Sequence, residues 1–102
     1  MRKIEQIIIK QPYQLICVFD NKEKRLLDLR DVLDETDKYA GKVFNSATFH
    51  QVKIGELGEL YWENLAEMKN LEGEIIKCAY DISPDLAYIK SQPIKKELEH
   101  DY

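Results

Sequence analysis

Short β-branched segments separated by turn residues are the feature that most constrains how this chain folds. Residues 4–9 and 13–19 are rich in isoleucine, valine and aromatic side chains, which favour extended strands, and residues 11–12 separate them. The polar residues 20–23 form a predicted hairpin turn, after which residues 24–29 return as a third strand. The first 29 residues therefore predict three consecutive antiparallel strands.

The second of these segments is apolar on both faces. Leu15, Cys17 and Phe19 fall on one face because side chains alternate along a strand. Ile16 and Val18 fall on the other face. The pattern predicts a central strand whose two faces are both covered.

A short helix is expected directly after the third strand. Leu29, Val32 and Leu33 have the spacing of one helical face. Asp28 precedes them and can accept a hydrogen bond from the first helical turn as an N-cap.

A second helix is expected over residues 83–91. Ser83 is a favourable N-cap, and Pro84 suits the first helical position. Leu86 and Ile89, joined by Ala87 and the stem of Lys90, are expected to form a buried stripe, which leaves Tyr88 on the flank with its hydroxyl in water.

The middle of the chain predicts two further hairpins. Residues 50–54 alternate as a strand, residues 55–58 reverse the chain, and residues 59–62 run back. Residues 63–80 are interpreted as a long hairpin around a turn at 70–73. The competing interpretation is a helix that uses Leu65, Met68 and Leu71.

The expected architecture is one α+β domain over residues 1–91. It contains an antiparallel sheet of about five strands, built from hairpins, with two short helices packed on it. Residues 92–102 are mostly charged and are expected to form a C-terminal tail.

Composition excludes several classes of function. The 102 residues include 44% hydrophobic and 33% charged residues, as expected for one globular domain. A net charge of −4 argues against direct nucleic-acid binding. The apolar runs of the chain are too short to span a bilayer. Near the N-terminus, Glu5 interrupts any segment that could serve as the apolar core of a signal peptide. A cytoplasmic protein with no membrane partner is the expectation.

Residues that could carry catalysis are sparse and scattered. His50 and His100 are the only histidines, no nucleophile motif surrounds the serines, and the four glycines form no phosphate-binding loop. Cys17 and Cys78 lie in apolar stretches without a paired metal-binding spacing, which favours two buried cysteines. We therefore expect no enzymatic activity, cofactor or metal.

An aromatic and acidic segment is the best candidate for binding a protein. Residues 55–75 contain six glutamates and one lysine, a net charge of −5, whereas residues 1–25 have a net charge of +3. Tyrosine and tryptophan are favoured at protein interfaces. The candidate partner-binding residues are Tyr61, Trp62, Glu59, Glu63 and His50. The alternative for Trp62 is core packing.

Three stretches, "VFDNKEKRLLDLRDVL", "FHQVKIGELGELYW" and "YDISPDLAYIKS", resemble the DUF-2442 family of small bacterial proteins. The resemblance covers roughly residues 10–91. Lys22 departs from the usual turn glycine of that family, and Ala87 precedes Tyr88 where leucine is more typical. The matching residues are Phe19, Asp20, Asn21, Glu23, Arg25, Asp28, Leu29, Phe49, Val52, Ile54, Trp62, Asp81, Ile82, Pro84, Asp85 and Tyr88.

The resemblance implies a small α+β domain without an established activity. Many members are encoded beside another small protein in what look like toxin–antitoxin pairs. Some carry a helix-turn-helix segment, which we do not expect after Tyr88 in this chain. The leading hypothesis is a non-catalytic binding protein that pairs with a small, toxin-like protein or with itself as a homo-oligomer. The alternative is a small-ligand-binding or minor enzymatic domain that uses Tyr61, Trp62 and His50.

Overall fold

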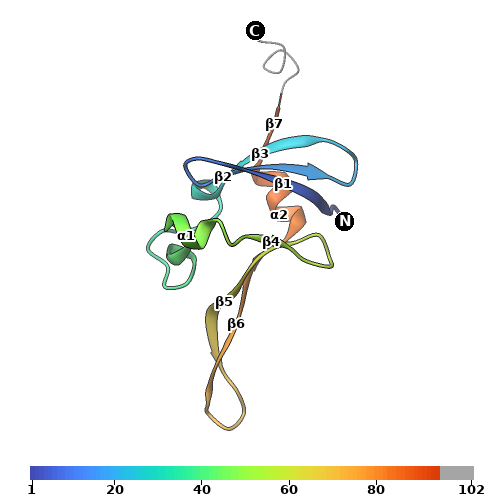
Figure 1. Ribbon diagram of the computed structural model, residues 1–102. Coiled ribbons are helices and arrows are strands. Elements are labelled where there is room, and N and C mark those ends of the chain that lie inside the picture. Colours follow the sequence, from blue (N-terminus) through green and yellow to red (C-terminus); the bar gives the residue numbers. More distant parts are fainter. Residues whose placement is uncertain (95–102) are drawn as a thin grey trace.

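The computed structural model describes residues 1–94 as an α+β fold with two antiparallel sheets (Figure 1). The first sheet has the order β1-β2-β3-β7, with strands at Ile4–Lys10, Gln14–Phe19, Lys24–Asp28 and Gln92–Pro93. The second has the order β4-β5-β6, with strands at Lys53–Ile54, Leu60–Lys69 and Ile75–Ile82. The α+β class is confirmed, whereas the expected single sheet of about five strands is divided into two sheets.

Helices are few and short in the described part of the chain. They are the 3-10 turns η1 and η2, the one-turn helix α1 and the longer α2, at Leu29–Asp31, Ala40–Val43, Ser46–Phe49 and Pro84–Lys90. Both predicted N-caps are present: Asp28 accepts the N–H of Arg30 at 3.0 Å, and Ser83 Oγ accepts the N–H of Leu86 at 3.1 Å. None of the helices within residues 1–94 combines the length and apolar character that a bilayer span requires.

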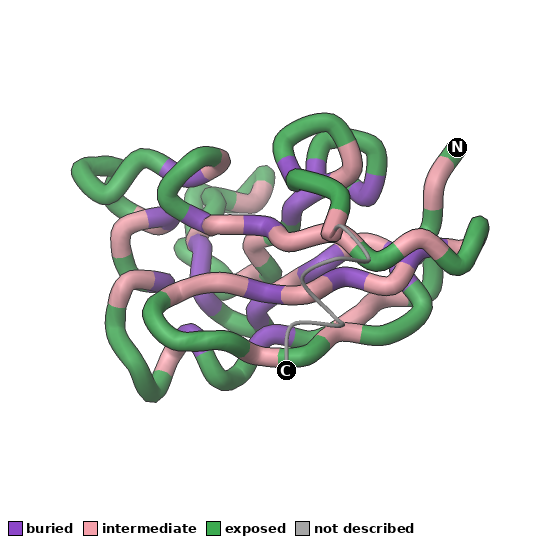
Figure 2. The backbone as a smooth tube through the Cα atoms, turned by 90° about the horizontal axis from the view of Figure 1, so that it is seen from above, coloured by how far each residue is buried: buried purple, intermediate pink, exposed green. Residues whose placement is uncertain are grey.

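The hydrophobic core lies on the inner face of the first sheet. Buried positions alternate with less buried ones along the strands (Figure 2). The largest fully buried side chains are Trp62, Phe19, Phe49, Leu15, Leu27, Leu29, Leu60, Val43 and Cys17. Burial raises the pKa of the Cys17 thiol to about 12. Cys78 is only half-buried on β6, so the prediction of two buried cysteines is right for Cys17 alone.

The outer face of β2 is less covered than its sequence predicts. Ile16 and Val18 are half-buried, and Ile8, which pairs with Ile16 on β1, is 50% exposed. The prediction that both faces of this strand are covered is therefore wrong for the face that carries Ile16 and Val18, which is only partly covered.

α2 packs through a different face from the one its apolar spacing predicts. Pro84 and Ala87 are its buried residues, whereas Leu86 and Ile89 are 40% and 73% exposed. Tyr88 is drawn inward, with its ring edge-to-face on Phe19 at 5.0 Å between centroids. The predicted stripe is therefore right for Ala87 and wrong for Leu86 and Ile89, because contacts of Tyr88 orient the helix.

The β5–β6 hairpin extends away from the rest of the molecule, and we call it the arm (Figure 1). This confirms the long hairpin over residues 63–80 and excludes the competing helix. Its turn contains Gly73 at φ +81°, and Asn70 accepts the N–H groups of Glu72 and Glu74. A β-bulge interrupts the pairing between Trp62 and Ala66.

The first sheet continues beyond residue 91, the expected end of the domain. Pro93 and Gln92 pair with Arg25 and Leu26, and the N–H of Ile94 donates to the carbonyl of Lys24 at 3.2 Å. Residues 92–94 therefore belong to the fold, and residues 95–102 of the predicted tail lie outside the described part of the chain.

Candidate functional site

The predicted partner surface is only partly assembled. Tyr61 and Glu59 are half-buried, and both line a hollow of about 390 Å³. Glu56 and Asp81 add two more carboxylates to this hollow. The Glu59 carboxylate accepts the N–H of Leu57 at 3.0 Å, which holds it beside the turn before β5. The hollow is therefore acidic, with one aromatic side chain in its wall.

Trp62 and Glu63 lie on opposite sides of β5. Trp62 is 1% exposed and belongs to the core, so its prediction as a partner-binding residue is wrong. Side-chain alternation explains this, because Tyr61 and Trp62 are neighbours on one strand and must point to different faces. Glu63 is exposed and forms an ion pair with Lys53 at 3.2 Å on the adjacent strand.

His50 is exposed at the end of α1, and its side chain contacts Ser46 in the same helix and Gln11 from the β1–β2 turn. Its Nδ1 lies 2.7 Å from the carbonyl oxygen of Ser46, and its Nε2 lies 3.4 Å from the side-chain amide of Gln11. Among residues 1–94 its hydrogen-bond partners include no carboxylate. The contacts do not link His50 to Tyr61 or Trp62, so the alternative site is not assembled as one cluster.

The most concentrated polar contacts surround Arg25, and we call Glu23, Arg25, Tyr88 and Ser91 the Arg25 cluster. The Arg25 guanidinium donates to Ser91 Oγ at 2.8 Å, to the Ser91 carbonyl at 2.7 Å and to Glu23 at 2.8 Å. It also lies 4.2 Å from the centroid of the Tyr88 ring, within the range of a cation–π contact. Only 12% of the Arg25 side chain is exposed.

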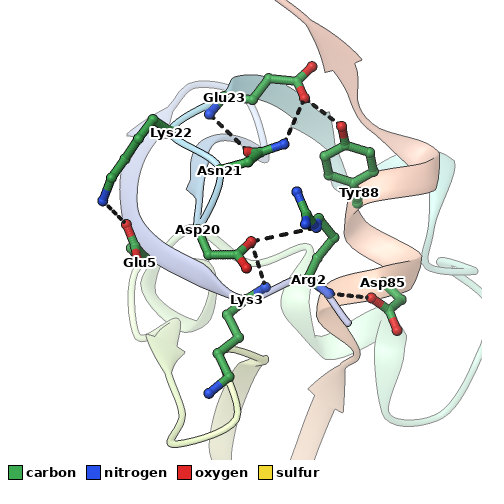
Figure 3. A network of polar contacts seen from close by, with 9 residues as sticks. All are labelled: Arg2, Lys3, Glu5, Asp20, Asn21, Lys22, Glu23, Asp85 and Tyr88. Carbon is green, nitrogen blue, oxygen red and sulfur yellow. Dashed lines mark hydrogen bonds and ion pairs between the residues drawn. The ribbon is translucent and has the colours of Figure 1, made fainter.

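Tyr88 closes the cluster by donating its hydroxyl to Glu23 at 2.5 Å (Figure 3). Glu23 lies in the hairpin turn before β3, and Asn21 in the same turn accepts the N–H of Glu23 at 3.0 Å. The turn therefore presents one carboxylate to both Arg25 and Tyr88. Polar groups more than 60 residues apart in the sequence hold α2 on β3.

The N-terminal segment joins the same region through Asp20 and Asp85 (Figure 3). The N–H of Lys3 donates to Asp20 at 3.2 Å, and the Arg2 side chain lies 3.6 Å from the same carboxylate. The N–H of Arg2 donates to Asp85 at 2.8 Å. Most residues that carry the family resemblance in the 20–25 and 81–88 stretches thus make contacts that hold the fold together.

Hydrogen bonds from Tyr88 and Arg25 hold the pKa of the Glu23 carboxyl below its ordinary value of 4.5. The ionised form is therefore the form that the folded protein favours. A carboxylate held ionised by two donors is a poor general acid, so the cluster is suited to a structural role.

Lowering the pH is expected to destabilise the wild-type protein more steeply than a Glu23→Gln variant. The folded pKa of Glu23 is depressed, so its stabilising contribution is complete above about pH 4.5 and is lost as pH falls through the folded pKa. Urea unfolding at several pH values between neutral and strongly acidic conditions measures both curves. Glu23→Gln should be less stable at neutral pH and should converge with wild type in acid. If the free energy of unfolding changed with pH in the same way for both proteins, the stabilising role of the Glu23 carboxylate would be contradicted.

The outer half of the arm exposes an apolar surface. Met68, Ile75 and Ile76 are 53%, 64% and 42% exposed, and Leu71 at the turn is fully exposed. Met68 and Ile76 are directly paired across the two strands, which makes their side chains one continuous patch. Large apolar side chains grouped in this way on a projecting hairpin are typical of a protein-binding surface.

A hollow of about 210 Å³ lies between this patch and the loop that contains Tyr39. Tyr39, Met68 and Ile75 supply its apolar wall, and Lys38, Lys69 and Glu67 supply charged groups. The Tyr39 ring also lies 5.3 Å from the Lys38 ammonium group. An aromatic side chain with apolar neighbours and a charged rim can accept a protruding side chain from another protein.

Sequence reasoning missed this end of the arm. Ile75 and Ile76 are adjacent, and adjacent strand residues point to opposite faces of a hairpin. Because a two-stranded projection has no second layer, at least one of them had to be exposed. That signal was available from the sequence, whereas the position of Tyr39 beside Met68 was not.

Comparison with known proteins identifies no relative. No family model matches the chain, and neither a curated protein nor a solved structure matches it.

Proposed function

We propose that this protein is a non-catalytic binding protein that pairs with a small protein partner through the arm. The proposed surface is the apolar end of the arm, where Met68 and Ile76 lie on one face of the hairpin and Ile75 on the other, with Leu71 at the turn and Tyr39 beside Met68. The observation that carries the proposal is the group of exposed apolar side chains on the projecting hairpin.

Charge supports the choice of partner. Residues 55–75 have a net charge of −5, and four of their glutamates, Glu63, Glu67, Glu72 and Glu74, lie on the arm or its turn. A partner with a basic rim around an apolar centre would complement this surface. The resemblance to the DUF-2442 family favours the product of the adjacent gene as that partner, in an antitoxin-like pairing within the cytoplasm.

Substitution of Met68 tests the proposal. The purified chain and the product of the adjacent gene are mixed at micromolar concentrations, and binding is measured by calorimetry. Met68→Asp is expected to weaken binding by about 30-fold or more, because it places a charge in the apolar centre of the surface.

Ile89→Asp is the matched control, because Ile89 is equally apolar and 73% exposed but lies on α2. It should bind like the wild type, and both variants should keep the wild-type melting temperature. A wild-type chain that ignores the neighbouring gene product at these concentrations would refute the proposed pairing. Equal losses in the two variants would refute the arm as its site.

A further inference from the structure

We propose that two copies of this chain associate edge to edge through β6, with Lys77 of each copy opposite Asp81 of the other. The proposal goes beyond the binding of a different protein and concerns only the purified chain. It depends on three properties of β6: a free edge, a matching charge pattern and an acidic hollow beside that edge.

β6 is the outer strand of the second sheet. Within residues 1–94 it pairs with β5 on one side only, and the sheet order ends with it. Proteins commonly protect such edges with proline, a bulge or several lysines. β6 contains no proline and a single lysine, and the bulge of this sheet lies on β5. Its edge is therefore open to another strand.

The backbone groups that face this edge can be identified from the ladder. The N–H of Asn70 donates to the carbonyl of Glu74 at 2.9 Å across the arm's turn. Hydrogen-bonded and non-hydrogen-bonded pairs alternate along an antiparallel ladder. Counting from this pair and following the observed register, Lys77, Ala79 and Asp81 direct their N–H and C=O groups away from β5.

A two-fold axis beside Ala79 would let the outward-facing N–H and C=O groups of β6 form hydrogen bonds with those of β6 in a second copy. Antiparallel pairing then places Ala79 opposite Ala79 of the second copy, with their Cα atoms about 5.5 Å apart. Lys77 faces Asp81 of the second copy twice, once on each side of the axis. Sliding the strands by two residues would place Lys77 opposite Ala79 and lose both ion pairs. Sliding them by four residues, so that Lys77 faces Lys77, would place like charges together.

The monomer leaves both charged residues available for this pairing. Lys77 is exposed, and its contact with Glu67 is a loose 3.9 Å. Asp81 has no ion-pair partner within residues 1–94 and lines the acidic hollow with Glu56 and Glu59. A lysine that arrives from a second copy on this face would therefore meet several carboxylates. Small Ala79 at the axis lets the strands approach without a clash.

Charge reversal tests the arrangement. Sedimentation velocity of the purified chain over a range of micromolar concentrations should show a monomer–dimer equilibrium. Lys77→Asp and Asp81→Lys should each weaken dimerisation about tenfold or more, because each creates two like-charge contacts per dimer. Combining the two substitutions should restore dimerisation. Lys69→Asp makes the same charge change on β5 and should have little effect.

Hydrogen exchange provides a second test that needs no variant. The outward-facing amide of Ala79 should exchange more slowly as the wild-type concentration rises, whereas the Cys78 amide, which faces β5, should not change. A chain that stays monomeric throughout this range, or a double variant that fails to recover, would overturn the proposal. Dimerisation without the neighbouring protein would leave the proposed arm–partner pairing to be judged separately.

Discussion

Trp62→Ala is expected to lower the free energy of unfolding by about 3–5 kcal/mol. Trp62 is 1% exposed and lies in one core cluster with Phe19, Leu60 and Ala87, so its removal leaves a large cavity. The cavity joins elements of both sheets and α2, which limits how far they can collapse into it. The loss is measured by denaturant unfolding followed by circular dichroism. Tryptophan fluorescence cannot be used, because Trp62 is the only tryptophan in the chain and the variant lacks it.

Two neighbouring substitutions sharpen this prediction. Tyr61→Ala should cost about 1 kcal/mol or less, because Tyr61 is half-buried and lies on the opposite face of β5. Trp62→Phe should cost less than Trp62→Ala, because the buried indole N–H has no hydrogen-bond partner within residues 1–94. If the Trp62→Ala variant were as stable as the wild type, Trp62 could not be a core residue, and the fold described above would be contradicted.

Arg25→Ala is expected to lower the free energy of unfolding by about 2–4 kcal/mol. The substitution removes the donors that bind Glu23 and both oxygens of Ser91, and it also removes the cation over the Tyr88 ring. Partial exposure of Glu23 lets water replace some of these contacts, which keeps the loss below that of a fully buried pair.

Lys24→Ala is the matched control for Arg25→Ala. It removes the same charge from the preceding residue of β3, but Lys24 is exposed, and its change should stay within about 0.5 kcal/mol. Amide exchange adds a readout for the role of the Arg25 cluster. The amides of α2, including the Ser91 N–H that donates to Ala87, should exchange faster in Arg25→Ala than in Lys24→Ala. Equal exchange rates would show that the cluster does not hold α2.

Local signals predicted individual elements well. The caps at Asp28 and Ser83, the turn at 70–73 and the long hairpin over 63–80 are all present. Each of these depends on side-chain–backbone hydrogen bonds or turn conformations within a few residues, and such interactions are encoded in a short stretch of sequence.

Contacts between distant residues were not predictable in the same way. α2 has an apolar stripe at Leu86 and Ile89, but the helix docks through Ala87 and Tyr88 instead. The orientation follows from Phe19 and from the Arg25 cluster, whose members come from β3, its preceding turn and the end of α2. No local pattern indicates that polar contacts would outweigh the stripe.

The candidate sites show the same division. Tyr61 and Glu59 were predicted and do line one hollow, whereas Trp62 is in the core and His50 is held by Ser46 and Gln11. The positions of Tyr61 and Trp62 depend on which face of β5 packs against the first sheet. The exposure of Met68, Leu71, Ile75 and Ile76 depends on how far the β5–β6 hairpin extends beyond the part of β5 that packs on the core.

The amino-acid sequence by itself determined the α+β class, the hairpins and the starts of η1 and α2, because alternation, caps and turns act over a few residues. Only the tertiary structure decided the division into two sheets, the docking face of α2 and the exposed edge and end of the arm. Those features depend on which buried surfaces and paired polar groups meet across the fold, and residues far apart in the chain supply both sides of each contact.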